Sequence, residues 1–181
     1  MTDSLYFDTD CISAFLWVSE EHILASLYSG RIGIPQQVYI ELSYPGTPQL
    51  KARADVLIAS GDAAIAYILT GSPDYDLYSK LTSIPDEGHS IIGKGEAAVI
   101  ALANSSGGIV ASNNLKDVAS YVSELGLRHI TTGDIMVKAL AESLITEADG
   151  NTIWSAMLAK KRKIGAVSFS EYLRLHQCKH L

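Results

Sequence analysis

The stretch Leu5-Tyr6-Phe7-Asp8-Thr9-Asp10 organises the interpretation of the whole sequence. A short apolar run that ends at a polar residue is typical of a buried strand in a parallel sheet, and Asp8 would stand at the carboxyl end of that strand. Open α/β sheets bind their ligands at this edge. A carboxylate buried there is costly unless it is paired, hydrogen-bonded or bound to a cation. The stretch therefore poses the question of which positive charge faces Asp8.

Apolar runs alternate with helix-like spacing along the rest of the chain. We expect further strands at about 31–34, 109–111 and 127–130, while residues 63–69 fit either a strand or a short helix. Helices are expected between these strands. The alternation predicts an α/β protein with a short, mainly parallel sheet between two helical layers, that is, a three-layer α/β/α sandwich.

Capping residues predict where some of the helices begin. Ser19 is expected to cap a helix that starts at Glu20, and Thr146 to open a long helix that ends in the basic run 160–163. Residues 84–92 are expected to form a loop. The extra helices at the C-terminal end, about 146–181, would form an appendage on a single domain over 1–181.

Composition excludes several classes of protein. No run of about 18 apolar residues is present, so we expect no membrane span. The N-terminus lacks the basic region of a signal peptide, and Cys11 and Cys178 lack metal-ligand spacing, so we expect a cytoplasmic protein with inert thiols. No glycine-rich loop of the dinucleotide or P-loop kind follows a strand.

The net charge of −6 restricts how the protein could bind nucleic acid. An acidic protein does not attract a polyanion through its overall field. A local basic patch or a bound divalent cation would have to reverse the sign.

Four acidic residues stand where they could meet at one edge of the predicted sheet. Asp8 ends the first strand, Glu41 lies on the helix after the second, Glu96 begins an alanine-rich helix, and Asp117 lies one turn into the helix after the strand at 109–111. Clustered carboxylates would hold Mg²⁺ or Mn²⁺, which prefer oxygen ligands. Such ions activate water and neutralise charge on a phosphodiester.

Each acid also has an ordinary structural explanation. Asp8 could serve only as a helix N-cap, and Glu41 could face solvent. Glu96 and Asp117 could simply favour the positive end of a helix dipole. The pattern formed by all four acids is more specific than any one of them.

The stretches around these acids resemble the motifs of PIN-domain ribonucleases, which include VapC-type toxins. The matching segments are Phe7-Asp8-Thr9-Asp10-Cys11-Ile12, Val38-Tyr39-Ile40-Glu41-Leu42, Gly95-Glu96-Ala97-Ala98-Val99-Ile100-Ala101-Leu102-Ala103 and Ala111-Ser112-Asn113-Asn114-Leu115-Lys116-Asp117. The resemblance implies an endoribonuclease that depends on Mg²⁺ or Mn²⁺, a parallel sheet flanked by helices, frequent homodimers and, in bacteria, an antitoxin partner.

The resemblance assigns a role to each matching residue. Asp8, Glu41, Glu96 and Asp117 would be catalytic, and Asp8, Glu96 and Asp117 would hold the metal. Thr9, Asp10 and Asn114 would orient the ligands or water. Candidates for contact with the RNA backbone are Lys116 and the basic residues Lys160, Lys161 and Arg162.

The chain departs from the family pattern at two places. Asp10 stands where the family usually has Asn or Ser, and Asn113-Asn114 stand where some branches have a pair of aspartates. The second departure would weaken the fourth acidic position.

Two other interpretations remain open from the sequence. Asp8-Thr9-Asp10 also resembles the Asp-x-Asp motif of haloacid-dehalogenase-type phosphatases, in which the first aspartate is a nucleophile. The other alternative is a PIN-like module that binds nucleic acid or a partner with little catalysis.

Overall fold

A computed structural model describes residues 3–83 and 90–178, and at residues 115, 117, 177 and 178 it describes the backbone alone. The strands of the described part are β1 (Leu5–Phe7), β2 (Ile32–Pro35), β3 (Ala63–Ala66), β4 (Ile109–Ala111) and β5 (Arg128–Ile130). The helices are α1 (Thr9–Val18), α2 (Glu21–Tyr28), α3 (Gln36–Leu42), α4 (Pro48–Ala59), α5 (Pro73–Ser83), α6 (Lys94–Ser106), α7 (Leu115–Glu124), α8 (Thr132–Ala141), α9 (Glu147–Ala159) and α10 (Phe169–Cys178).

The five strands form one parallel sheet in the order β3-β2-β1-β4-β5, with β1 at its centre. Residues 63–69, which the sequence left open, begin with the edge strand β3. Since every pair is parallel, the carboxyl ends of all the strands lie at one edge. Asp8 follows β1 at that edge, as predicted.

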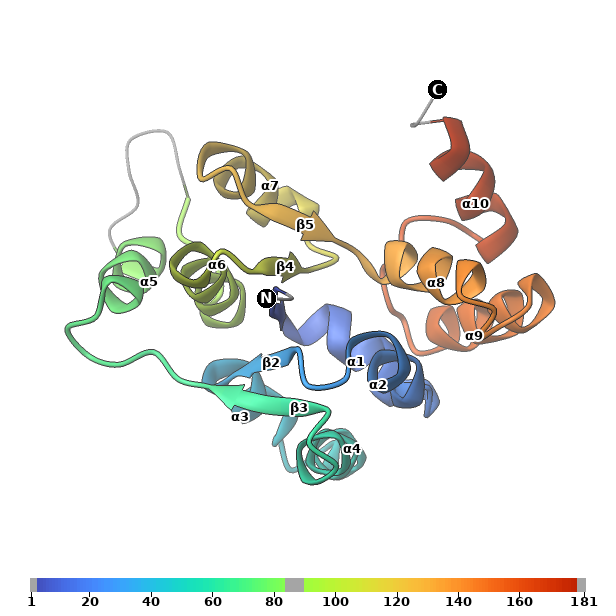
Figure 1. The fold of residues 1–181 in the computed structure, drawn as a ribbon, viewed down its shortest axis with the longest axis horizontal. Helices are drawn as coiled ribbons and strands as arrows, with labels where there is room; N and C mark the ends of the chain where they lie inside the picture. The colour runs from blue at the N-terminus through green and yellow to red at the C-terminus, as the bar shows by residue number, and fades with distance from the viewer. Residues whose placement is uncertain (1–2, 84–89, 179–181) are drawn as a thin grey trace.

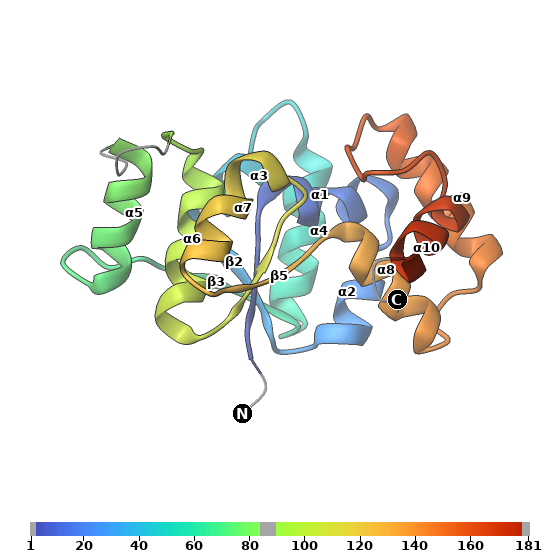
Figure 2. The ribbon, with the colours of Figure 1, turned by 90° about the horizontal axis from the view of Figure 1, so that it is seen from above.

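Alternating side chains of β1 divide the interior into two apolar clusters. Leu5 and Phe7 face the larger cluster, which includes α1, α2, α4, α8 and α9, whereas Tyr6 faces the smaller one under α5, α6 and α7. Figure 1 shows these helices on opposite sides of the strands, and Figure 2 shows α5 at one end of the molecule and the group α8, α9 and α10 at the other. The three-layer α/β/α prediction is confirmed.

The helices near the C-terminal end share the larger cluster with the sheet. Trp154, Met157 and Phe169 are fully buried in it, and the Trp154 ring packs on Phe169 at 5.8 Å and on Tyr172 at 5.2 Å between centroids. This part of the chain is therefore held against α1 by packing in the core.

One of the two expectations about helix ends was wrong. Ser19 does not cap α2: it ends α1 in the left-handed conformation at φ 66°, and Glu20 precedes α2 without a side-chain cap. The helix α9 begins after its cap Thr146 and ends at the first residue of the basic run, because Lys160 is its C-cap, and Lys161 then has a positive φ of 59°. The predicted loop over 84–92 lies largely outside the described residues. Among the described residues, no helix is both long and apolar enough to cross a membrane.

Candidate functional site

Asp8 is the only one of the three described candidate acids that is buried, with 2% of its surface exposed. It caps α1, because its Oδ1 accepts the N–H of Cys11 at 2.6 Å. Its Oδ2 is buried and has no hydrogen-bonding partner among the described residues. The N-cap explanation therefore accounts for one carboxylate oxygen and leaves the other unexplained.

The surroundings of Asp8 disfavour its charge. Burial raises the pKa of Asp8 to about 7, and the charges of Asp10 and Glu96 act in the same direction. The nearby hydroxyl of Ser112, which forms no hydrogen bond of normal geometry with Asp8, and the N–H of Cys11 act in the opposite direction without cancelling the effect of burial. A buried oxygen without a partner, next to other acids, is an environment that a cation would stabilise.

Glu96 lies in the first turn of α6, half-buried, on the side of β1 opposite to the α1 layer. Its Oε1 accepts a hydrogen bond from Nδ2 of Asn114 at 3.3 Å. Asn114 therefore contacts a candidate ligand, and its role in orienting that ligand stays a prediction.

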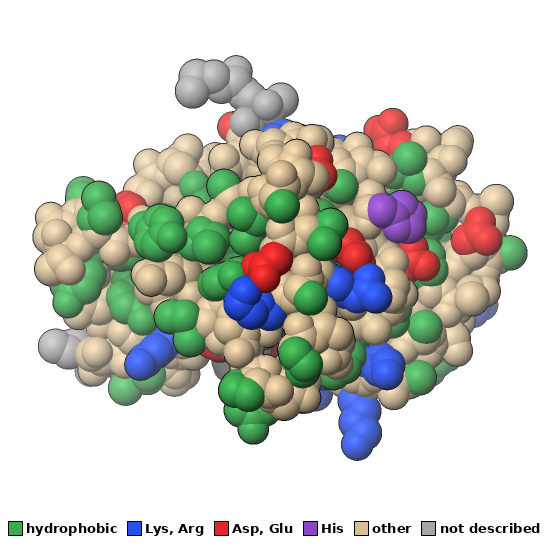
Figure 3. Space-filling view, turned by 90° about the horizontal axis from the view of Figure 1, so that it is seen from below, with side chains coloured by type: hydrophobic (Ala, Val, Ile, Leu, Met, Phe, Trp, Pro, Cys, Tyr) green, Lys and Arg blue, Asp and Glu red, His purple; other side chains and the backbone are tan. Residues whose placement is uncertain are grey.

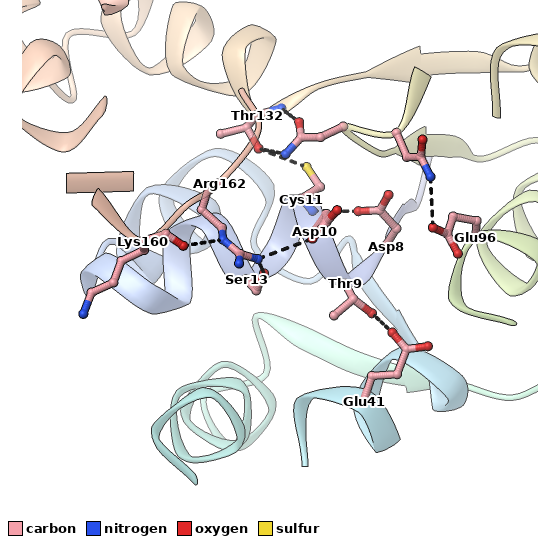
Figure 4. Close-up of polar contacts among 12 residues, drawn as sticks. Asp8, Thr9, Asp10, Cys11, Ser13, Glu41, Glu96, Thr132, Lys160 and Arg162 are labelled. Atoms are coloured by element: carbon pink, nitrogen blue, oxygen red, sulfur yellow. Dashed lines mark hydrogen bonds and ion pairs between the residues drawn. The ribbon is translucent and has the colours of Figure 1, made fainter. Parts of the chain in front are cut away.

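Glu41 lies on α3, and its side chain is exposed. The hydroxyl of Thr9 donates a hydrogen bond to Oε2 of Glu41 and so ties the first turn of α1 to α3. Both carboxylate oxygens of Glu41 lie 3.4 Å from the position that a Cβ on Gly95 would occupy. Glu41 thus sits against the start of α6, beside the residue that precedes Glu96 (Figure 4).

The fourth acid, Asp117, belongs to α7, but its side chain lies outside the described part of the structure. Its role stays a prediction. Within the described part, no group of three or more histidine, cysteine or acidic side chains is close enough to hold a metal ion.

Asn113 and Asn114, which stand where some branches of the family have two aspartates, contact different parts of the structure. Asn113 accepts a hydrogen bond from the N–H of Thr132 at 2.9 Å and donates one to its hydroxyl at 2.8 Å. Its side chain thereby joins the end of β4 to the start of α8. Asn114 turns the other way, toward Glu96.

Asp10 points away from Asp8 and toward the basic run. Nη1 of Arg162 lies 3.3 Å from Oδ1 of Asp10 and 3.3 Å from the hydroxyl of Ser13. The other basic candidates are exposed, and the ammonium of Lys160 lies over the Trp17 ring at 5.5 Å from its centroid. Lys116 is exposed on α7.

Sequence reasoning missed Ser112 as part of this site. Its side chain is fully buried beside Asp8, and its hydroxyl accepts the N–H of Asn114 at 3.1 Å. The signal was its position, because Ser112 follows β4 at the same edge at which Asp8 follows the neighbouring strand β1.

Fold and site together define an α/β protein with a parallel sheet, a buried carboxylate, Asp8, after its central strand, and Glu96 at the start of α6. The family model DUF3368, described as a PIN domain, matches residues 5–177. The chain belongs to this PIN-domain family, which confirms the resemblance seen in the sequence and counts against the phosphatase interpretation.

Among solved structures, the chain is similar to one described as VapBC2 from Rickettsia felis bound to a DNA fragment from their promoter. That match has a TM-score of 0.51 and 16% sequence identity, and it covers 70% of this chain and 97% of the other. At this identity the likeness concerns the fold. No match is found among curated proteins.

Proposed function

We propose that this protein is a metal-dependent endoribonuclease. The observation that carries the proposal is the buried Oδ2 of Asp8, which has no partner among the described residues although Glu96 adds negative charge nearby. Membership of the PIN-domain family supports a nuclease, and the structure of the site supports a cation.

The donors at this site fit a hard divalent cation, because they are carboxylate oxygens. Asp8, Glu96 and Asp117 would hold Mg²⁺ or Mn²⁺, with Glu41 close to the start of α6. When bound, such an ion activates water and neutralises charge on the phosphodiester.

The residues around these acids would keep them in place. Thr9 orients Glu41 through its hydroxyl, and Asn114 orients Glu96 through its amide. Hydrogen bonds of this kind lower the cost of arranging a site for metal and substrate.

A cleavage assay tests the proposal. Purified protein should cut a single-stranded RNA with Mn²⁺ or Mg²⁺ and lose this activity in EDTA. Asp8→Ala should abolish cleavage, with its circular dichroism spectrum unchanged. Full activity of Asp8→Ala would contradict the assignment of Asp8.

Calorimetric titration with Mn²⁺ decides between an enzyme and a binding module. The module remains an alternative because the described residues hold no group of three metal-binding side chains. Wild-type protein that fails to bind millimolar Mn²⁺ would favour the module.

We further propose that the protein acts as the toxin of a toxin–antitoxin pair in the cytoplasm. Induced expression in a bacterial host should then arrest growth, and Asp8→Ala should remove the effect. A small protein encoded beside this one should bind it and restore growth. Growth that is unaffected by the wild-type protein would contradict the toxin role.

A homodimer is the expected assembly, and one face of the molecule supports it. The face seen in Figure 3, on the β3 side, gathers apolar side chains toward α5. Tyr67 and Leu69, just after the edge strand β3, are 56% and 70% exposed. An exposed sheet edge flanked by apolar residues favours contact with a second copy. Light scattering should show a dimer that Leu69→Lys converts to a monomer.

A further inference from the structure

Arg162 reaches the candidate site from a distant part of the chain. It belongs to the basic segment, residues 160–163, which lies between α9 and α10. Its guanidinium packs against the first half of α1, where it meets Asp10 and Ser13 (Figure 4). Asp10 lies in the first turn of α1, the helix that Asp8 caps, so this cation lies at the start of the same helix.

Three contacts set the orientation of the guanidinium. Nε donates to the carbonyl of Lys160 at 3.1 Å, and Nη1 lies 3.3 Å from both the Asp10 carboxylate and the Ser13 hydroxyl. Ser13 is 1% exposed, so this part of the contact is rigid. Among the described residues, Nη2 has no partner. The side chain is held through Nε and Nη1, and 24% of it is exposed.

The contact with Asp10 leaves the guanidinium able to bind another anion. It joins Nη1 to one carboxylate oxygen at 3.3 Å, and the side chains of Arg162 and Asp10 are 24% and 60% exposed. Water screens the exposed carboxylate, so this single contact holds the guanidinium weakly. A phosphate can accept two parallel N–H bonds from one guanidinium, which is the stronger arrangement.

The rest of the basic segment adds charge next to Arg162. Lys161 and Lys163 are exposed, and Lys160 lies over Trp17 on α1. In a chain of net charge −6, this group of cations next to α1 would supply the attraction that the overall field lacks.

We propose that Arg162 binds a backbone phosphate of single-stranded RNA next to the phosphodiester held at Asp8. This inference rests on the proposed function and deepens it, since it names the residue that positions the substrate. The part of the chain after α8 would then complete the substrate site.

RNA binding measured by fluorescence anisotropy in EDTA, at several salt concentrations, tests the inference. Arg162→Ala should weaken binding about tenfold. It should also reduce the slope of log affinity against log salt by about 0.7, the value for one phosphate contact on a single strand. Arg162→Lys, which keeps the charge without the planar fork, should lie between Arg162→Ala and wild type.

Arg128→Ala is the matched control. Arg128 also pairs with a carboxylate, Asp3, at 2.7 Å, and donates to a carbonyl, that of Gly107. It begins β5 and so lies at the opposite edge of the sheet from Asp8. Its removal should leave the salt slope unchanged.

Asp10→Asn separates phosphate binding from a merely structural role. If Arg162 only fastens the basic segment to α1, Asp10→Asn and Arg162→Ala should weaken RNA binding together. If Arg162 binds phosphate, Asp10→Asn should tighten binding, because it removes a competing negative charge while Ser13 and the Lys160 carbonyl still hold the guanidinium.

The outcomes distinguish this inference from the proposed function. A wild-type salt slope in Arg162→Ala, or no RNA binding by the wild-type protein, overturns the inference. RNA binding that depends on Arg162, without cleavage in Mn²⁺, overturns the proposed function and leaves the inference standing.

Discussion

The two oxygens of Asp8 have different surroundings, and the difference accounts for the chemistry expected there. Oδ1 caps α1, which any aspartate before a helix could do. Oδ2 is buried and has no hydrogen-bonding partner among the described residues. A buried oxygen without a partner costs free energy. The metal-free protein therefore carries a local destabilisation at the site proposed for the cation, as is common for functional residues.

Replacing Asp8 by Asn should stabilise the metal-free protein. Burial raises the folded-state pKa of Asp8 to about 7, against a model value of 3.8. The contribution of this carboxyl to the free energy of unfolding is therefore fully present below pH 3.8, and it is lost as pH rises toward 7. In EDTA at pH 8, Asp8→Asn should raise the free energy of unfolding by roughly 1–4 kcal/mol.

Urea unfolding at pH 8 and pH 5 measures this gain. It should shrink at pH 5, where the wild-type carboxyl is largely protonated and resembles the amide. Asp76→Asn, an exposed acid in the first turn of α5, is the control and should change little at either pH. A loss of stability in Asp8→Asn at pH 8 would show that Oδ2 has a favourable partner.

At the scale of elements, α8 and α10 are joined through Asp134. Its carboxylate completes a capping box with Thr131 and accepts the hydroxyl of Tyr172 at 2.9 Å. His176 lies 3.3 Å from it. Burial alone would raise the pKa of Asp134, but the hydrogen bonds from Thr131 and Tyr172 and the charge of His176 outweigh it and lower the pKa.

Asp134→Asn should destabilise the protein in a manner that depends on pH. Because the folded pKa is depressed, the carboxylate stabilises the fold above the model value of 3.8, and this contribution is lost as pH falls through the folded pKa. We expect a cost of about 1–2 kcal/mol at pH 7, typical of a lost cap with a charge-assisted bond. Thermal unfolding from pH 7 down to 3 should show the mutant and wild-type curves converging in acid.

The packing of α10 on α8 also requires a residue without a side chain. A Cβ at Gly133 would lie 2.2–2.6 Å from ring atoms of Tyr172. Gly133→Ala should therefore cost about 1–3 kcal/mol by overpacking. In a double-mutant cycle, Gly133→Ala should cost much less in a Tyr172→Ala background, and equal costs in both backgrounds would exclude this contact as the cause.

At the scale of the whole molecule, metal binding should be coupled to folding. A ligand that binds only the native state adds about 2.7 kcal/mol of stability at one hundred times its dissociation constant. Mn²⁺ should therefore raise the unfolding temperature of the wild-type protein and leave that of Asp8→Asn unchanged. Calorimetric melting with Mn²⁺ and with Ca²⁺ tests this, and an equal shift in both proteins would place the ion elsewhere.

Much of the fold could be predicted from short-range pattern. The strand at 109–111 and the helix over Thr9–Val18 agree with the structure, because apolar periodicity and helix starts are local properties. Residues 63–66 could not be assigned, since the same apolar run suits a strand or a helix until β2 offers it an edge. Ser19 was misjudged because one serine between two helices can end the first or begin the second.

The residue types of the site, the α/β alternation and the family followed from the amino-acid sequence alone, because each motif is a contiguous stretch. Tertiary structure was needed to separate the roles of Asp8 and Asp10, two residues apart. Asp8 is buried, and one of its oxygens lacks a partner among the described residues. Asp10 pairs with Arg162. Burial and long-range charge pairing depend on which distant segments pack together, and the local sequence pattern does not determine that packing.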